Sequence, residues 1–394
     1  MPRIDDILIL DGARTPVGTF LGGLSRITPT ALGVTAAKGA LERAGVSPEQ
    51  VDATIFGNVL QSAKDTVYLA RHVGLQVGMP EDRAALVVNR ACASGMEAVI
   101  QGAKAMAVGE AQCVLAGGAE NMSMTPYAMR GVRQGWRMVK SDVDDVLFSA
   151  LHDPMAGCSI GETVEFLAAE QGITREEADA AAVEAQQRAT RAQEAGVYAE
   201  EIVPVMAGRR RKPISVERDE APRPESTLEA LAALPGLYEG GVNTAGNSCG
   251  LNDAAAAVVM STSAMAEQSG ARVLGRVVSW ANVGIAPKRM GLGPVEASRR
   301  ALADAGLTVA DLDVVELNDS FAVQSIAVQR ALELDPATIN PNGGALALGH
   351  PMGATGTRLV LSALYHLRRT QGRYGLATLC VGGGQGTAIV LERA

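Results

Sequence analysis

The sequence is poor in aromatic residues and has no long apolar run. Aromatic residues make up 3% of its 394 residues, so its core must be built from Ala, Val, Leu, Ile and Met. No apolar stretch approaches the roughly 18 residues needed to span a bilayer. The first ten residues, MPRIDDILIL, carry acidic side chains where a signal peptide needs basic ones. We therefore expect a cytoplasmic globular protein without a membrane partner.

Cysteine is also scarce, and its pattern excludes two common uses. The five cysteines are an odd number without a C-x-x-C pair, which fits neither a disulfide framework nor a zinc site, so no metal is expected. Reduced thiols agree with a cytoplasmic location. The formal net charge of −8 argues against a nucleic-acid partner. A local basic patch could still bind the phosphates of a small ligand.

An internal repeat predicts two similar α/β domains. The length of 394 residues exceeds the ~250–300 at which a single core stops growing. Residues 36–59 resemble residues 294–319, and each copy reads as an amphipathic helix that ends at Ala-Gly before a short apolar strand. Residues 92–120 then parallel residues 350–384 as a turn, a long helix and an apolar strand. Chance similarity of Ala-rich segments is the alternative, but four elements match in the same order.

The segment between the two copies reads as an insertion carried by the first half. A helical pattern covers 174–195, a basic cluster covers 209–212, and a Pro- and charge-rich loop is predicted over 213–226. Such an insertion is the natural place for substrate-binding loops. The predicted boundaries are 1–120 for the N-terminal half, 121–250 for the inserted loop domain, 251–271 for a return segment to the N-terminal half, and 272–394 for the C-terminal half.

Two residues precede predicted helices at nearly equivalent places in the repeat. Cys92 follows the apolar run Ala84–Val88 and a turn of small residues, and a helix is predicted from about Ser94. A thiol at a helix N-terminus feels the positive end of the dipole, which favours the thiolate. A buried structural cysteine is the alternative. His350 lies in a glycine-rich turn fixed by Pro351. A histidine in such a turn is a stronger candidate for a functional role than most histidines.

A second cysteine and a serine complete the candidates found from local patterns. Cys380 ends a predicted buried strand and is followed after one residue by three glycines, whose backbone N–H groups can bind an anion. The segment GNSCG around Ser248 matches the G-x-S-x-G elbow of hydrolases. That elbow needs a strand directly before the turn, and the preceding EGGVNTA is no convincing strand. We therefore set the hydrolase interpretation aside.

Six motifs occur in the order and spacing typical of the thiolase family. They are ARTPVG, VVNRACASGMEAV around Cys92, GNSCGLNDAAAA, LNDSFA, GGALALGHPMGATG and LCVGGGQG. Over essentially its whole length, the chain resembles the acetyl-CoA acetyltransferases and 3-ketoacyl-CoA thiolases of this family. The resemblance implies an α/β fold of two similar halves in a five-layer α-β-α-β-α arrangement, with an inserted loop domain.

The resemblance also implies roles for five residues. Cys92 is the nucleophile that takes the acyl group, and His350 accepts its proton. Cys380 moves the proton on the α-carbon of the acetyl unit. Asn318 in LNDSFA holds a water that completes one oxyanion hole, although on local pattern alone it could be a turn residue at a strand end. The backbone N–H groups of Cys92 and Gly382 form the other oxyanion hole. Two thiols and one imidazole meet the needs of Claisen chemistry without a metal or organic cofactor.

Coenzyme A contacts follow from the resemblance in the same way. Arg223 matches a position near the adenine nucleotide, and Ser248 and Cys249 lie in the motif that meets the CoA tail. The family's serine in that motif falls on Cys249 here, which puts this contact in doubt. The cluster at 209–212 is either a second phosphate contact or a solvated surface run.

Two further departures bear on specificity. The family usually has Glu where this chain has Asp319, and the shorter carboxylate is expected to change the hydrogen bonds around Asn318 and His350. Acetoacetyl-specific members often carry His-Met in the pantetheine loop, where this chain has Ser159 and Ile160. That difference weakens a strictly C4-specific assignment.

The implied activity is the reversible Claisen condensation and thiolysis of 3-oxoacyl-CoA through an acyl-cysteine. A homo-oligomer, either a dimer or a tetramer, is expected. Two alternatives stay open. A 3-oxoacyl-ACP synthase would share the nucleophile but pair it with two His or with His and Asn, which disagrees with Cys380. A non-catalytic, thiolase-like acyl-CoA-binding protein disagrees with the retention of Cys92, His350 and Cys380 together.

Overall fold

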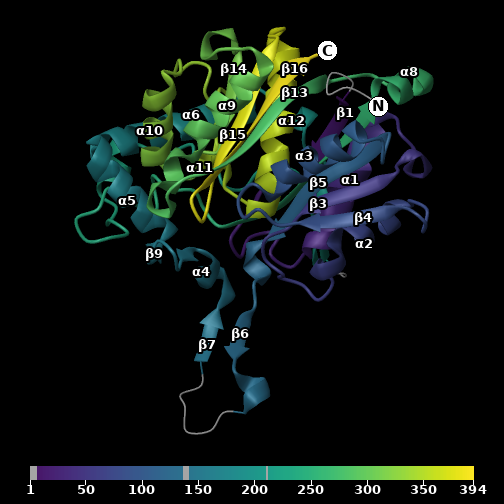
Figure 1. The fold of residues 1–394 in the computed structure, drawn as a ribbon. Coiled ribbons are helices and arrows are strands. Elements are labelled where there is room, and N and C mark those ends of the chain that lie inside the picture. The colour runs from purple at the N-terminus through teal and green to yellow at the C-terminus, as the bar shows by residue number, and fades with distance from the viewer. Residues whose placement is uncertain (1–6, 136–141, 210–211) are drawn as a thin grey trace.

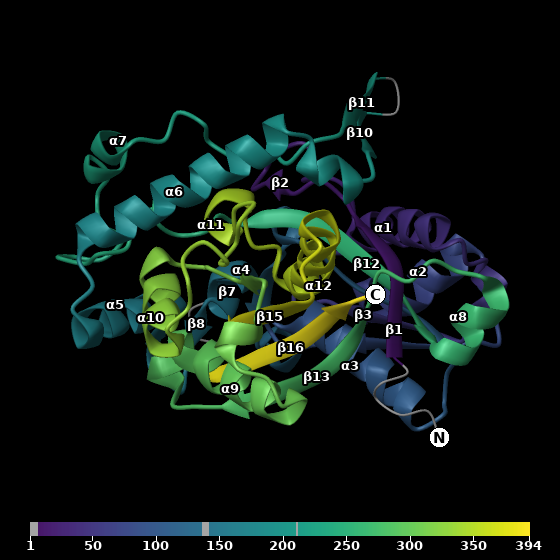
Figure 2. The same cartoon turned by 90° about the horizontal axis from the view of Figure 1, so that it is seen from above.

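The computed structural model describes residues 7–135, 142–209 and 212–394. Two halves share one plan, and an insertion extends from the first (Figures 1 and 2). The N-terminal half contains β1 (Ile7–Arg14), β2 (Gly18–Thr19), α1 (Pro29–Ala44), β3 (Ala53–Gly57), α2 (Leu69–Val77), β4 (Ala84–Val88), α3 (Ser94–Ala107), β5 (Cys113–Asn121), β12 (Asn252–Thr262) and α8 (Ser263–Ser269). The C-terminal half contains β13 (Gly275–Gly284), α9 (Gly293–Ala305), β14 (Val314–Leu317), α10 (Ala322–Leu332), α11 (Ala345–Leu348), α12 (Met352–Thr370), β15 (Tyr374–Val381) and β16 (Gln385–Arg393).

The strand order reveals the repeat. The order is β14-β15-β16-β13-β1-β12-β5-β3-β4, with β2 paired to β12. In the first half β3 runs parallel to β4 and β5, and β12 runs antiparallel to β5 and β1. In the second half β14 runs parallel to β15, and β16 runs antiparallel to β15 and β13. The two sheets meet edge to edge where β1 pairs with β13 through Leu8 and Ile9.

The helix ends of the repeat agree with the sequence pattern. Helix α1 ends at Gly45 with φ 65°, and helix α9 ends at Gly306 with φ 67°. Both glycines adopt the left-handed conformation that closes a helix at little steric cost. Strands β3 and β14 then follow, so the predicted helix–glycine–strand unit is confirmed in both copies.

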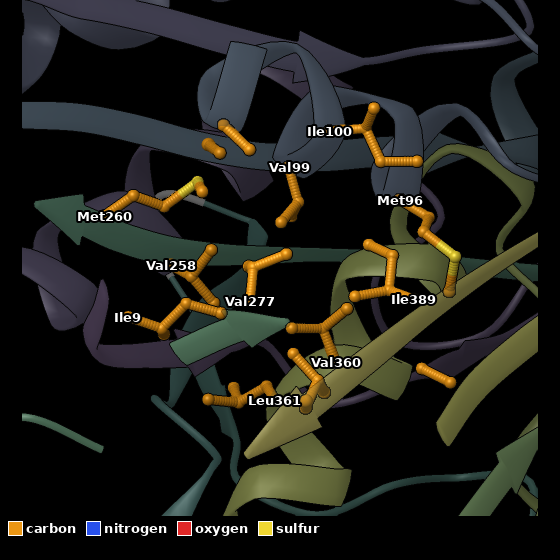
Figure 3. Packing of buried hydrophobic residues seen from close by; sticks show 14 of the residues in the cluster. Ile9, Met96, Val99, Ile100, Val258, Met260, Val277, Val360, Leu361 and Ile389 are labelled. Carbon is orange, nitrogen blue, oxygen red and sulfur yellow. The ribbon is translucent and has the colours of Figure 1, made fainter. Parts of the chain in front are cut away.

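Five layers result from the packing of helices on these sheets. Helix α1 covers the outer face of the first sheet, and α9 covers the outer face of the second. Helices α3 and α12 lie between the two sheets and share one core with them. Figure 3 shows that core, which includes Met96, Val99 and Ile100 of α3 and Val360 and Leu361 of α12, with side chains of the strands between them. Each such fully buried side chain contributes about 1.5–3 kcal/mol. The five-layer prediction is confirmed.

Glycines allow the two central helices to touch near their N-termini. A Cβ at Gly95 of α3 would come within 2.6 Å of the Gly353 carbonyl oxygen of α12. A Cβ at Gly118 of β5 would overlap the same oxygen, and one at Gly356 would overlap the backbone of Met96. Larger residues would force the helices apart. The turns that precede α3 and α12 are therefore held at one place in the molecule.

The insertion adds a hairpin arm, helices and two further small hairpins. Its elements are β6 (Tyr127–Arg130), β7 (Asp142–Asp145), α4 (Val146–Ala150), β8 (His152–Asp153), β9 (Cys158–Ser159), α5 (Ile160–Gln171), α6 (Arg175–Glu194), β10 (Val205–Arg209), β11 (Lys212–Val216) and α7 (Leu228–Ala232). The helix predicted over 174–195 is confirmed by α6. The loop prediction for 213–226 is wrong over its first residues, because β11 pairs antiparallel with β10. Figure 1 shows the β6–β7 arm reaching away from the body.

A buried ion cluster ties the insertion to the first half. The Arg14 guanidinium donates to Glu201 at 2.9 Å and to both carboxylate oxygens of Asp219 at 2.7 and 2.9 Å. Asp219 also accepts from the Val17 N–H at 2.8 Å. Removing one partner of such a buried pair leaves an uncompensated charge. Across residues 7–135, 142–209 and 212–394, no helix is long and apolar enough to cross a membrane.

Candidate functional site

Cys92 lies in a tight, strained turn between β4 and α3. Ala91 has a φ of 41°, which is uncommon for a residue with a side chain. The Ser94 hydroxyl holds the turn, because it accepts from the Arg90 N–H at 2.9 Å and donates to the Ala91 carbonyl at 2.7 Å. Strain of this kind persists only where the surroundings fix it. The position of the thiol is thus set by the fold.

The backbone N–H groups of Gly382 and of Cys92 itself lie near the Cys92 sulfur. Burial raises the pKa of Cys92 above its ordinary value, and these nearby N–H groups only partly oppose this rise. Burial therefore outweighs the stabilisation of the thiolate expected from the helix N-terminus. A neutral thiol needs a base to take its proton before it can attack.

His350 supplies a neutral imidazole in which one ring nitrogen, Nε2, can accept a proton. Its backbone N–H donates to Asn252 Oδ1 at 3.0 Å, and its Nδ1 lies 2.8 Å from the Thr355 hydroxyl. That hydroxyl donates to the Pro351 carbonyl at 3.0 Å, so its oxygen accepts from Nδ1–H. Among the described residues, the buried Nε2 has no hydrogen-bond partner. Burial, with a smaller effect of Arg358, lowers the pKa of His350 to about 3, so the ring is uncharged at neutral pH.

The contact between the two central helices brings these residues together. Cys92 and His350 each lie three residues before a glycine, Gly95 or Gly353, at which α3 and α12 touch. Cys92 also packs in one small cluster with Met352, the first residue of α12. Both helix N-termini therefore point the two candidate groups toward the same space.

The parallel pair β14 and β15 positions Cys380 and Asn318. Leu317 lies opposite Thr378, and the Asn318 N–H donates to the Thr378 carbonyl at 3.0 Å. Burial first, and nearby Cys92 second, raise the pKa of Cys380 to about 12, while the Ser320 hydroxyl opposes that rise. The electrostatic effect of Cys92 on Cys380 places the two thiols in one site. Both thiols rest protonated.

The Asn318 amide is half satisfied. Its Nδ2 donates to Ser320 Oγ at 2.7 Å. Its buried Oδ1 has no partner in the part of the chain that the structure describes. A buried acceptor without a partner is a site for an ordered water. Such a water would donate one proton to Oδ1 and keep a second for a ligand carbonyl, as the predicted oxyanion hole requires.

The three departures from the family pattern have defined surroundings. Asp319 accepts from the Ala345 N–H at 2.5 Å, so it caps α11 directly before the His350 turn. Ser159 caps α5 and lies 2.8 Å from the Tyr238 hydroxyl. Cys249 is half-buried; burial raises its pKa above the ordinary value, and the nearby Cys92, Asp319 and Cys380 add to this rise. Cys249 therefore lies with the reactive thiols.

A cavity of about 240 Å³ runs beside the reaction centre, lined by both Arg223 and Ser248. Gly349, directly before His350, also lines it, so the cavity reaches from the insertion to the turn that carries His350. Among the residues that the structure describes, Cys249 does not line this cavity. The side chains of the basic cluster at 209–212 lie outside the described residues. No group of three or more potential metal ligands is found within the described ranges.

Sequence reasoning missed three positioning residues. Thr355 fixes the proton on His350, Asn252 holds the His350 backbone, and Ser320 contacts both Asn318 and Cys380. All three lie inside the quoted motifs. Thr355 comes five residues after His350, in the first turn of the following helix, which is the one signal that could have pointed to it.

Comparison with known proteins supports this architecture. Two family models match the chain, the N-terminal domain of thiolase over residues 7–264 and the C-terminal domain of thiolase over residues 271–393. The beta-ketothiolase BktB of Cupriavidus necator is 44% identical over 390 residues, which is 98% of this chain and 99% of that protein. The human mitochondrial 3-ketoacyl-CoA thiolase is 41% identical over 395 residues, covering 100% of this chain and 99% of that protein.

Solved structures agree. The crystal structure of human mitochondrial 3-ketoacyl-CoA thiolase in complex with CoA matches with a TM-score of 0.97 at 41% identity, covering 100% of this chain and 99% of that chain. The acetyl-CoA acetyltransferase of Bacillus anthracis matches with a TM-score of 0.97 at 37% identity, with full coverage of both chains, each at 100%. The chain belongs to the thiolase family, and it is an acyltransferase.

Proposed function

We propose that the protein catalyses the reversible Claisen condensation and thiolysis of 3-oxoacyl-CoA, with the acyl group carried on Cys92. One observation carries this proposal. A neutral imidazole, with its proton fixed on Nδ1 and its Nε2 lacking a partner among the described residues, lies in the turn before α12. The first residue of α12 packs with Cys92, and Cys92 lies near the thiol of Cys380. The relatives named as beta-ketothiolase, acetyl-CoA acetyltransferase and 3-ketoacyl-CoA thiolase support the substrate class.

Acyl capture follows from the first pair of groups. In thiolysis the Cys92 sulfur attacks the 3-oxo carbon, and its proton passes to His350 Nε2. The backbone N–H groups of Cys92 and Gly382, which lie near the Cys92 sulfur, are suited to bind the oxygen of the resulting thioester. Removing one such donor from an oxyanion hole typically costs about 2.7–4 kcal/mol of transition-state stabilisation.

Carbon–carbon chemistry needs the second thiol. When the C2–C3 bond breaks, its electron pair moves to C2 and gives the enolate of acetyl-CoA. Cys380, a thiol at rest, donates its proton to that carbon, and a water held by Asn318 stabilises the enolate oxygen. The thiol of a second CoA then gives its proton to the Cys380 thiolate and takes the acyl group from Cys92, and the released Cys92 sulfur regains the proton held by His350. Condensation runs through the same steps in reverse, with Cys380 removing the α-proton.

Coenzyme A binding, cofactor use and chain length follow as parts of the proposal. CoA occupies the cavity between Arg223 and Gly349 with its thioester toward His350.

No cofactor beyond the CoA thioesters takes part. The Ile160 Cδ1 lies 3.5 Å from where a Cβ of Gly382 would be, so its size bears on the acyl chains accepted. We infer a broader 3-oxoacyl range than acetoacetyl-CoA alone.

The assembly is a homo-oligomer in the cytoplasm, either a dimer or a tetramer. The β6–β7 arm supports self-association, because it exposes large apolar side chains away from the body (Figure 1). Their exposed fractions are 68% for Tyr127, 56% for Met129, 47% for Val132 and 53% for Val143. Contiguous apolar surface of this kind is typical of interaction sites.

A thiolysis assay tests the proposal. The purified protein is given acetoacetyl-CoA and longer 3-oxoacyl-CoAs with free CoA, and loss of the 3-oxo thioester is followed. Turnover with several chain lengths is expected. Turnover only with acyl carrier protein thioesters would indicate a 3-oxoacyl-ACP synthase. Binding of acyl-CoA without any turnover would indicate a non-catalytic binding protein.

A further inference from the structure

We propose that Ser320 is a positioning residue for proton transfer at the α-carbon, because its hydroxyl orients the Cys380 sulfur and the Asn318 amide together. This inference rests on the proposed function, which gives Cys380 the transfer of that proton. Ser320 is 5% exposed, so its hydroxyl must find its partners inside the protein. The two partners are groups that the chemistry uses.

Strand register explains why Ser320 meets both groups. Strands β14 and β15 run parallel, with Leu317 opposite Thr378. The chain continues this pairing one residue further, where the Asn318 N–H donates to the Thr378 carbonyl. Ser320 follows Asn318 by two residues, and Cys380 follows Thr378 by two residues. The same register therefore brings Ser320, just beyond the end of β14, toward Cys380 near the end of β15.

The Ser320 hydroxyl can still donate a hydrogen bond, because it acts only as an acceptor toward Asn318. Asn318 Nδ2 donates to Ser320 Oγ at 2.7 Å, so the Ser320 oxygen is the acceptor there. The O–H of Ser320 is then available as a donor, and the strand register together with the lowering effect of this hydroxyl on the pKa of Cys380 places it near the Cys380 sulfur. A donor pointed at a sulfur stabilises its thiolate form more than its thiol form. Ser320 thus supports the state of Cys380 that removes the α-proton.

The backbone of Ser320 is fixed as well. Its carbonyl accepts from the Cys249 N–H at 2.8 Å, and residues 248 and 321 form a bridge beside it. The other titratable groups around Cys380 are Cys92, from the turn before α3, and Cys249, from the loop before β12, together with His350 and Asp319. His350 is neutral because its pKa is lowered to about 3, and burial raises the pKa of Asp319, next to Ser320, to about 6. Burial raises the pKa of both thiols, so both are neutral near pH 7. Neither supplies a positive charge to Cys380, which makes the Ser320 donor matter more.

A comparison of Ser320→Ala with Ser325→Ala tests the inference. Ser325 is a matched control, because it lies in α10 only five residues further along and is also partly buried. Two reactions are measured for each variant between pH 6 and pH 9. One is exchange of the acetyl-CoA methyl protons with deuterium from solvent, and the other is formation of the acyl adduct on Cys92.

Exchange depends on the small thiolate fraction of Cys380 throughout this range, because the pKa of Cys380 is raised to about 12. Loss of a hydrogen bond to a charged group shifts a pKa by about one unit, which is a factor of about ten. Ser320→Ala should therefore exchange about tenfold more slowly at every pH and form the Cys92 adduct at the wild-type rate. Ser325→Ala should match the wild type in both reactions.

Three results would overturn the inference. Exchange by Ser320→Ala at the wild-type rate would show that its hydroxyl has no such role. An equal loss of exchange and of adduct formation would indicate a general structural effect. A loss in Ser325→Ala of the same size would do so too. Cys380→Ser separates the inference from the proposed function, because exchange that survives in that variant removes Cys380 from the reaction whatever Ser320 does.

Discussion

Replacing Thr355 by valine tests the proton placement on which the proposed acyl capture depends. Valine has nearly the shape of threonine but no hydroxyl. The change removes the acceptor of the His350 Nδ1–H, at 2.8 Å, and the bond from Thr355 to the Pro351 carbonyl. The imidazole is neutral at pH 7, because its pKa is lowered to about 3, so a single proton is shared between its two nitrogens.

The size of the effect follows from that sharing. With valine at 355, a proton on Nδ1 is a buried donor without an acceptor. Such a donor costs about 1–3 kcal/mol, or roughly a 5- to 150-fold change in population. The proton is then no longer held on Nδ1, so Nε2 is not always free to accept from Cys92, and the imidazolium that forms when His350 takes the Cys92 proton also lacks its Nδ1–H acceptor. The rate of acyl transfer to Cys92 should fall by about the same factor, while CoA affinity stays near the wild-type value.

The assay is single-turnover formation of the acyl-enzyme from acetyl-CoA, stopped by acid and measured as intact mass. Thr357→Val is the matched control, because the Thr357 hydroxyl is buried in the same helix and donates to the Gly95 carbonyl at 2.9 Å. Thr357→Val should lose stability but acylate at the wild-type rate. Equal rates for both variants and the wild type would refute the tautomer argument. An equal loss in both would show that helix packing, not the imidazole proton, is responsible.

Three further predictions follow from the structure. Arg223→Ala should raise the KM for CoA with little change in kcat, because it removes binding common to ground and transition states; an unchanged KM would refute this placement. Cys380→Ser should still form the Cys92 adduct but lose thiolysis by about 10²–10⁴-fold, the usual contribution of acid–base catalysis; full thiolysis would make Cys380 structural. Met129→Glu combined with Val143→Glu should give a smaller assembly by light scattering than the wild type, and an unchanged mass would remove the arm from the interface.

The sequence could predict where the reactive groups stand along the chain. Cys92, His350 and Cys380 each lie at a boundary between elements, and the patterns of apolar residues and glycines mark those boundaries. The repeat predicted the two halves for the same reason, because both copies keep a helix, a left-handed glycine and a strand in order. Local patterns are enough for features of this kind.

Features that depend on burial could not be predicted in this way. The helix N-terminus at Cys92 is a local feature, but the burial that raises the pKa of its thiol comes from elements far apart in the chain. The partnership of Thr355 with His350 depends on ring orientation in the folded turn. The pairing of β1 with β13 is an edge contact between halves, and β11 forms because β10 lies beside it. Each of these features depends on contacts with other segments of the folded chain, and the periodicity of the sequence does not encode such contacts.

The most direct test of the proposed function is to locate the acyl group. Wild-type protein treated with acetyl-CoA should gain the mass of one acetyl group, and peptide mapping should place it on Cys92. Cys92→Ser should keep its fold, gain no such mass and lose all turnover, because a hydroxyl lacks the acidity and nucleophilicity of a thiol. An adduct on another residue, or turnover that survives Cys92→Ser, would contradict the mechanism proposed for this thiolase.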